Sequence, residues 1–118
     1  MGQHTFCYSD KKIGQRYEEI VQQLQKHDDG KIWLDDYDVL DHEAEQLHNQ
    51  LQTPYHDMFR CGKRKENGTY VDDIKLYSLK ETLEFIKDPV NRCTTDEHTV
   101  EQLQKFFYDY PDGYITFG

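Results

Sequence analysis

The chain lacks the features of a membrane protein and those of a disulfide-rich protein. No stretch of its 118 residues approaches the roughly 20 consecutive apolar residues that a membrane-spanning helix needs. Its three cysteines, Cys7, Cys61 and Cys93, are odd in number and far apart, which is not typical of a disulfide framework. The first ten residues contain no basic segment followed by an apolar one, so we expect no secretory signal. A reducing cytoplasm is the location that we predict.

Recognisable motifs for catalysis, cofactors and metals are also missing. Residues 28–31, Asp-Asp-Gly-Lys, are too few for a phosphate-binding loop and are typical of the end of a helix. The cysteine and histidine pairs lack the close spacing of zinc ligands, although a site assembled from distant segments stays open. Glu45 and His48 have the spacing of a di-metal ligand pair, but that site needs a second copy on another helix. The sequence therefore predicts no cofactor, no metal site and no catalytic residue.

The three thiols are expected to differ in reactivity. Cys7 lies on a predicted strand and Cys61 on a predicted core face, where a packed thiol is inert. Cys93 precedes a predicted helix, and the N-terminus of a helix favours a thiolate. We therefore expect Cys93 to react most readily.

Charge is the strongest bias in the composition. Twenty-three acidic residues against fourteen basic ones give a net charge of −9, which disfavours direct binding to nucleic acid or to an anionic membrane. Residues 31–57 contain seven carboxylates and a single lysine, whereas residues 58–92 contain eight basic and six acidic side chains. The charge is thus polarised between an acidic helix within residues 31–57 and residues 58–92, which we call the basic arm. The net negative charge favours basic partners.

Apolar periodicity and turn residues predict a single compact domain over residues 1–118. Ser9 stands at the expected cap of the first helix, and capping boxes at 78–81 and 94–97 open the last two helices. The apolar seam of the second helix is narrow, which is typical of packing against another helix. The expected elements are strand 3–8, helix 10–27, helix 33–52, strands 58–66 and 69–77, helix 78–88, helix 94–110 and strand 114–117.

These elements predict the α+β class, with a small and mainly antiparallel sheet covered by helices on one face. We expect about four strands, in the order β-α-α-β-β-α-α-β, with the terminal strands joining the sheet. Asn-Gly at 67–68 favours a two-residue hairpin loop. In that hairpin Cys61 opposes Ile74 and Phe59 opposes Leu76, which gives one apolar face.

Aromatic residues are abundant, and their burial is expected to differ. The only tryptophan, Trp33, and the nearby Tyr37 are expected to be packed. Residues 106–114 contain too many aromatic side chains for one helix face to bury. Tyr108 and Tyr110 are therefore expected to border an interface or a pocket.

The leading functional hypothesis is a small, acidic, non-enzymatic protein-binding module. Its acidic surface would dock onto a partner with a basic surface, such as the phosphate-binding groove of a nucleic-acid-handling protein. Many inhibitor, immunity and phage counter-defence proteins share this general composition. The residues predicted to form the acidic surface are Asp35, Asp36, Asp38, Asp41, Glu43 and Glu45.

The basic arm supports an alternative hypothesis, in which the protein binds a small anionic ligand or a nucleotide. Basic side chains lie there beside tyrosines, which suit an anion and a stacked base. A small hydrolytic or metal-dependent enzyme is the second alternative. The residues of the alternative ligand site are Tyr55, His56, Arg60, Arg64 and Tyr70.

Overall fold

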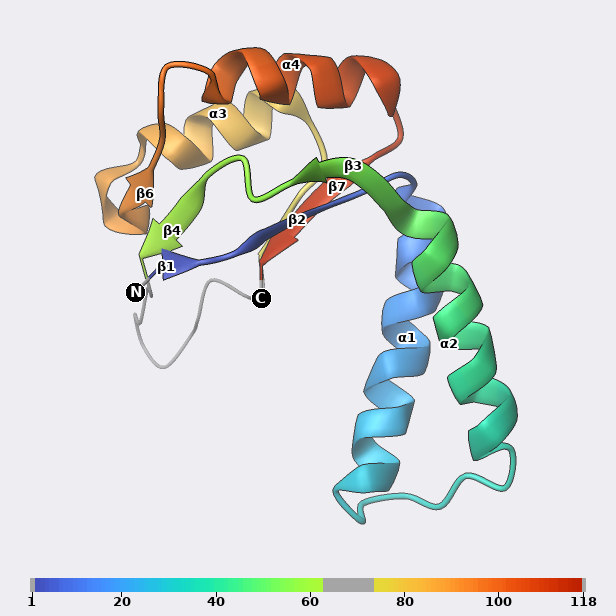
Figure 1. Ribbon diagram of the computed structural model, residues 1–118. Helices are drawn as coiled ribbons and strands as arrows, with labels where there is room; N and C mark the ends of the chain where they lie inside the picture. The colour runs from blue at the N-terminus through green and yellow to red at the C-terminus, as the bar shows by residue number, and fades with distance from the viewer. Residues whose placement is uncertain (1, 63–73, 118) are drawn as a thin grey trace.

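The computed structural model describes residues 2–62 and 74–117, and it has the α+β fold that the sequence predicts (Figure 1). The helices are α1 (Lys11–Asp28), α2 (Tyr37–Leu51), α3 (Leu79–Lys87) and α4 (Thr99–Asp109), with a short 3-10 turn, η2 (Pro89–Asn91). The strands are β1 (Gly2–Gln3), β2 (Thr5–Tyr8), β3 (Gln52–His56), β4 (Arg60–Gly62), β5 (Lys75–Leu76), β6 (Cys93–Thr94) and β7 (Tyr114–Phe117).

The described strands form two antiparallel sheets. The larger sheet has the order β3-β2-β7-β5, and the smaller sheet has the order β1-β4-β6. Strands β2 and β7, from opposite ends of the chain, lie side by side in the larger sheet, with Cys7 opposite Ile115. The expectation that the terminal strands join the sheet is therefore confirmed.

The strand pairing predicted around residues 67–68 is wrong wherever the structure describes it. Cys61 in β4 lies opposite Cys93 in β6, and the other neighbour of β4 is β1. Leu76 in β5 lies opposite Ile115 in β7. The predicted turn itself falls outside the described residues. Alternating apolar residues determine which face of a strand is buried, but they do not determine which strand lies beside it.

Helices α3 and α4 cover one face of the sheets and bury the main core (Figure 1). Because side chains alternate across a strand, Ile115 and Phe117 of β7 point into this core while Tyr114 and Thr116 point to the opposite face. The predicted core face of the arm is retained, since Phe59 and Cys61 are buried here. The buried residues of this core are Cys7, Met58, Phe59, Cys61, Leu76, Phe85, Leu103, Phe106, Ile115 and Phe117.

Helices α1 and α2 pack against each other and project away from the sheets (Figure 1). The narrow seam predicted for the second helix forms this contact, because Leu40 and Ala44 of α2 meet Ile20 and Leu24 of α1 in a separate, smaller core. The projecting helix pair therefore has its own core, and its far end is remote from the sheets.

Among the helices of residues 2–62 and 74–117, none has the length and apolar composition that crossing a membrane requires.

The start of α1 differs by one residue from the prediction. Asp10, and not Ser9, is the cap: its Oδ1 accepts hydrogen bonds from the N–H groups of Lys12 and Ile13 at 2.8 and 3.1 Å. The hydroxyl of Ser9 instead donates to the carbonyl of Gln50 at 3.0 Å. Ser9 thereby ties the start of α1 to the end of α2, a tertiary contact that no local pattern specifies.

The helix cap predicted at Ser78 is confirmed, although the carboxylate of Glu81 accepts a hydrogen bond from the Ser78 hydroxyl, at 3.2 Å, and not the backbone bond of a full capping box. The Oγ of Ser78 accepts a hydrogen bond from the N–H of Glu81 at 3.1 Å, at the start of α3. The box predicted at 94–97 is wrong, because α4 begins at Thr99 and strand β6 occupies the start of that box. Cys93 therefore lies in a strand, and the helix N-terminus that was expected to activate its thiol is not there.

Candidate functional site

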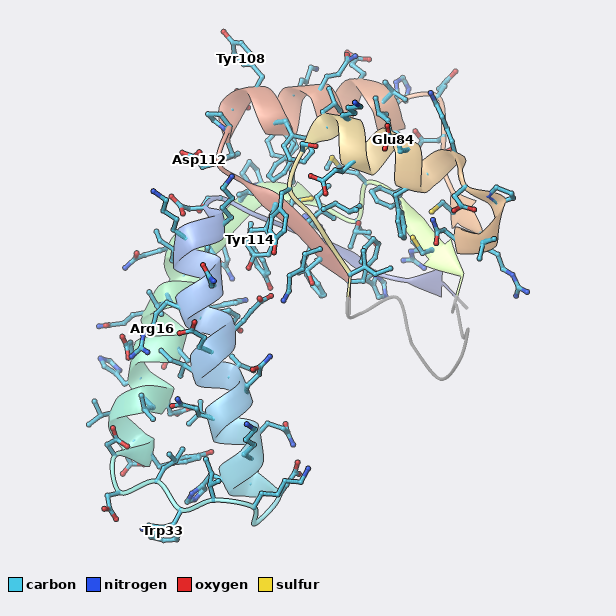
Figure 2. The ribbon with its side chains drawn as sticks, turned by 180° about the vertical axis from the view of Figure 1, so that it is seen from behind. Arg16, Trp33, Glu84, Tyr108, Asp112 and Tyr114 are labelled. Atoms are coloured by element: carbon cyan, nitrogen blue, oxygen red, sulfur yellow. The ribbon has the colours of Figure 1, made fainter. Side chains whose placement is uncertain are left out.

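The end of the α1–α2 pair that lies farthest from the sheets carries an exposed tryptophan. Trp33 lies in the connection between the two helices, with 78% of its surface exposed (Figure 2). Its indole Nε1–H donates a hydrogen bond to Asp35 Oδ1 at 2.8 Å. The prediction that Trp33 is packed is wrong. Because α2 begins only at Tyr37, the indole lies outside the seam between the helices.

Neighbouring side chains hold this connection in a defined shape. The ring of His27 lies 5.1 Å from that of Trp33 and 4.6 Å from that of Tyr37, measured between centroids. His27 Nδ1 also accepts a hydrogen bond from the Leu34 N–H at 3.2 Å. The hydroxyl of Tyr37 donates to Asp28 Oδ1 at 3.1 Å, and this hydrogen bond raises the pKa of Tyr37. A loop with such internal contacts loses little conformational freedom on binding.

The tryptophan belongs to a carboxylate-rich segment, residues 28–45, which we call the hairpin end after the helical hairpin of α1 and α2. This segment contains eight carboxylates and a single lysine. Glu43 is half-buried and faces α1, with its Oε2 3.1 Å from Nη2 of Arg16, so it joins the two helices. The other residues of the predicted acidic surface are exposed, in the connection or along one face of α2: Asp35, Asp36, Asp38, Asp41 and Glu45.

Two described residues of the alternative ligand site, Tyr55 and Arg60, contact carboxylates. The hydroxyl of Tyr55 donates to Asp109 Oδ2 at 2.6 Å, which raises the pKa of Tyr55. Nη2 of Arg60 lies 3.1 Å from Asp57 Oδ2. A depression of about 590 Å³ includes Tyr55 and His56, but its wall contains carboxylates as well as a lysine. Two residues of this predicted site lie outside the described residues: Arg64 and Tyr70.

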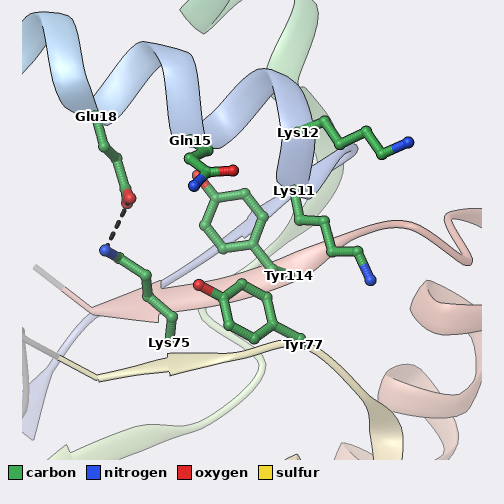
Figure 3. Close-up of a pocket in the computed structure, with 7 residues that line it drawn as sticks. All are labelled: Lys11, Lys12, Gln15, Glu18, Lys75, Tyr77 and Tyr114. Carbon is green, nitrogen blue, oxygen red and sulfur yellow. Dashed lines mark ion pairs between the residues drawn. The ribbon is translucent and has the colours of Figure 1, made fainter.

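A pocket that the sequence did not predict lies between α1 and the larger sheet (Figure 3). Its volume is about 410 Å³. Helix α1 contributes Lys11, Lys12 and Glu18, and the segment around β5 contributes Lys75 and Tyr77. Lys75 Nζ lies 2.8 Å from Glu18 Oε2. These residues come from segments far apart in the sequence, so no local spacing pattern brings them together.

Buried tyrosines line the sheet beside this pocket. Tyr114 is 1% exposed, and its hydroxyl has no hydrogen-bond partner among the described residues. The ring of Tyr8 lies 5.5 Å from that of Tyr114, and burial, with smaller effects from Tyr17 and Glu18, raises the pKa of Tyr8 to about 12. Burial also raises the pKa of Tyr114. Burial therefore favours the protonated form of both phenols.

Neither metal-binding geometry nor similarity to known proteins assigns a function. In the part of the chain that the structure describes, no three His, Cys, Asp or Glu side chains gather as metal ligands would. No protein-family model, curated protein or solved structure matches the chain. The function is therefore inferred from the residues of the chain and their surroundings.

Proposed function

We propose that this protein is a non-enzymatic binding module that docks its hairpin end onto a protein partner with a basic surface. The observation that carries the proposal is the exposed Trp33, which contacts Asp35 in a carboxylate-rich segment at the end of a projecting helix pair. Ile32 and Val39 of the same segment are also exposed. An apolar centre with a polar rim is the usual arrangement of a protein–protein interface.

Tryptophan supplies the apolar anchor of this proposed interface. Tryptophan is enriched among the few residues that dominate binding energy, and an aromatic side chain buries roughly 150–250 Å² when it is covered. The contacts of Trp33 with His27 and Asp35 hold the indole before any partner arrives. Less conformational entropy is then lost on binding, which favours affinity.

The carboxylates determine the kind of partner that is proposed. A dense acidic segment attracts basic surfaces and speeds their association. A protein that handles nucleic acid has such a surface in its phosphate-binding groove, and carboxylates displayed along a helix would compete with phosphates for it. The overall charge of −9 repels nucleic acid itself. The chain would then act as an antagonist of the immunity or phage counter-defence type.

The test uses the wild-type protein and two variants as bait for partners in an extract of the source cells. The hairpin variant carries Asp38→Asn and Asp41→Asn, both exposed on α2. The matched control carries Glu97→Gln and Glu101→Gln, which remove the same charge near the start of α4. We expect the wild type and the control to retain one basic partner, and the hairpin variant to lose it. The affinity of the purified pair should fall steeply as salt is added.

Three outcomes contradict the proposal. The first is a partner that the hairpin variant retains as well as the wild type does. The second is an affinity that does not change between low and high salt. The third is a partner whose contact surface is acidic. Circular dichroism and thermal melting of both variants show whether a lost partner reflects lost folding.

Binding of a small anionic ligand is the second candidate function. For this ligand the pocket of Figure 3 is a better site than the basic arm. Lys11 and Lys12 stand at this pocket beside the partly exposed ring of Tyr77, a combination that suits an anion attached to a planar group. Inorganic phosphate and a set of nucleotides are the probes. If this candidate holds, a nucleotide raises the melting temperature of the wild type but not that of a Lys11→Ala, Lys12→Ala variant. If neither phosphate nor any nucleotide changes the melting temperature of the wild type, this candidate function is excluded.

A further inference from the structure

Two cysteines that are 32 positions apart in the sequence lie directly opposite each other in the smaller sheet. Cys61 of β4 pairs with Cys93 of β6, and their Sγ atoms are 3.1 Å apart. The next pair along the strands is hydrogen-bonded, since the Gly62 N–H donates to the Arg92 carbonyl at 3.0 Å. In an antiparallel sheet such pairs alternate, so the cysteines occupy the position where opposite side chains are closest.

The backbone beside the cysteines is shaped for this close approach. A Cβ at Gly62 would lie 2.6 Å from the Cβ of Arg92, a distance that real side chains do not adopt. Arg92 has a left-handed backbone, with φ 51°, where it closes the η2 turn. The absence of a side chain at Gly62 therefore lets the chain return against β4 and places Cys93 over Cys61.

This arrangement satisfies the geometry of a disulfide. Directly opposite residues of an antiparallel pair have Cα atoms about 4.5–5.5 Å apart, which falls within the range of about 4.4–6.8 Å found in disulfides. The Sγ atoms need to approach by only about 1 Å more to reach a bonded distance. Small side-chain rotations are therefore sufficient, and the strands need not separate.

The two thiols have unequal exposure and acidity. Cys61 is fully buried, whereas Cys93 is partly exposed. A hydrogen bond from the Cys61 thiol lowers the pKa of Cys93, and the same interaction together with burial raises the pKa of Cys61. The third thiol, Cys7, is buried elsewhere, and burial raises its pKa to about 12. Cys93 is thus the thiol that an oxidant in solution reaches first as a thiolate, and Cys61 is the thiol next to it.

We propose that Cys61 and Cys93 are a peroxide-sensitive dithiol that closes to a cross-strand disulfide. The Cys93 thiolate attacks a hydrogen peroxide oxygen, the O–O bond breaks, and a sulfenic acid and hydroxide form. The Cys61 thiol then attacks the sulfenic sulfur, and its proton leaves with the displaced hydroxide as water. In sum, two thiols and one peroxide give one disulfide and two waters. The two electrons lost by the sulfurs reduce the peroxide.

The disulfide would link β4 covalently to β6 and close a loop that contains α3. Neither cysteine belongs to the hairpin end, so this inference is independent of the proposed function. Cross-linking residues 61 and 93 restricts the unfolded chain, and oxidised protein should therefore melt at a higher temperature than reduced protein.

The experiment treats fully reduced, folded wild-type protein with a small molar excess of hydrogen peroxide. We expect the thiols that can be titrated in denaturant to fall from three to one, and the intact mass to fall by two hydrogens. Peptide mapping should show the segments of Cys61 and Cys93 joined and Cys7 free. Reduction with dithiothreitol should restore all three thiols.

Variants test the order of the two steps. In Cys61→Ser no neighbouring thiol can displace the sulfenic hydroxide, since Cys7 is buried elsewhere, so dimedone should trap Cys93 as its sulfenic acid. A Cys7→Ser variant should oxidise as the wild type does, which controls for the third thiol. The proposal is overturned if wild-type Cys93 gains oxygen while Cys61 stays reduced, or if the disulfides that form join two molecules or involve Cys7. Mapping of wild-type protein decides this even if a variant fails to fold.

Discussion

The phenol ring of Tyr114 in β7 packs directly against the α-carbon of Gly14 in α1, and it occupies the space that a side chain at position 14 would need. This contact joins the base of the projecting helix pair to the face of the larger sheet that α3 and α4 leave uncovered. Glycine is required here because of this close approach, since α1 is regular around Gly14. The Gly14–Tyr114 contact therefore acts together with the ion pair between Glu18 and Lys75 to position α1 on the sheet.

Gly14→Ala should destabilise the protein. Alanine favours a helix over glycine by about 1 kcal/mol, but its methyl group meets the Tyr114 ring, and forcing such overlap costs typically about 1–3 kcal/mol. We expect a net loss of stability in urea denaturation. The neighbouring exposed residue supplies a control, Gln15→Ala, which should change stability by less than about 0.5 kcal/mol. Equal stability of Gly14→Ala and the wild type would mean that the ring moves aside freely.

Tyr114→Phe should leave stability unchanged or raise it. The hydroxyl of Tyr114 is buried without a partner in the described residues, and an unpaired buried hydroxyl costs about 1–3 kcal/mol. Phenylalanine keeps the ring and removes that cost. Urea denaturation at neutral pH measures the difference. A loss of more than about 1 kcal/mol would show that the hydroxyl makes a favourable contact in solution.

The two cores should open independently in hydrogen exchange. The core between α1 and α2 is small and includes Ile20, whereas Leu103 belongs to the larger core under α3 and α4. Ile20→Ala should cost about 2–5 kcal/mol locally and accelerate exchange mainly in α1 and α2. Leu103→Ala is the matched variant and should accelerate exchange in β2, β7 and α4. Equal acceleration of both regions by either variant would show one cooperative unit.

Stability should fall as the pH rises above about 9. Burial raises the pKa of Cys7 from 9.0 to about 12 and that of Tyr8 from 10.0 to about 12. Between these values the unfolded chain releases protons that the folded chain keeps, so alkaline pH favours unfolding. The melting temperature should decline from pH 9 to pH 12. Cys7→Ala should weaken the decline that begins at pH 9 and keep the decline above pH 10, which comes from the tyrosines. A melting temperature that stays constant from pH 9 to pH 12 would contradict the raised pKa values of Cys7 and Tyr8.

Trp33→Ala should weaken binding to the proposed basic partner by at least about tenfold, or about 1.4 kcal/mol. The side chain is 78% exposed, so the melting temperature should change little. The matched control is Tyr108→Ala on α4, where the aromatic ring is 86% exposed and remote from the hairpin end (Figure 2). Affinity measured with the same purified partner should not change in that control. Equal losses in both variants would point to a different binding surface.

Local patterns predicted much of the secondary structure because they reflect local physics. The apolar seam at Leu40 and Ala44 produced α2 and its packing against α1. The serine at position 78 correctly predicted the start of α3, because its hydroxyl caps the helix. The box at 94–97 failed because residues there pair with β4 instead, and strand pairing is a long-range interaction. The short strand β3 was missed because it follows α2 directly, where the sequence indicated only the end of a helix.

The proposed sites depend even more on long-range contacts. The acidic composition of the hairpin end was evident from the sequence, but the exposure of Trp33 was not, because it depends on where α2 begins. No sequence pattern indicated that Cys61 and Cys93, which are 32 positions apart, lie opposite each other. A glycine that permits a close approach, such as Gly62, is recognised only once its neighbour is known.

The sequence by itself determined the α+β class, the four helical segments, the final strand and the concentration of carboxylates in residues 28–45, because periodicity and charge are properties of adjacent residues. Only the tertiary structure decided the strand order, the hydrogen bond from Ser9 to Gln50, the projection of α1 and α2 from the sheets, and the pairing of the two thiols. Those features come from contacts between distant segments, whose energies depend on how the whole chain packs.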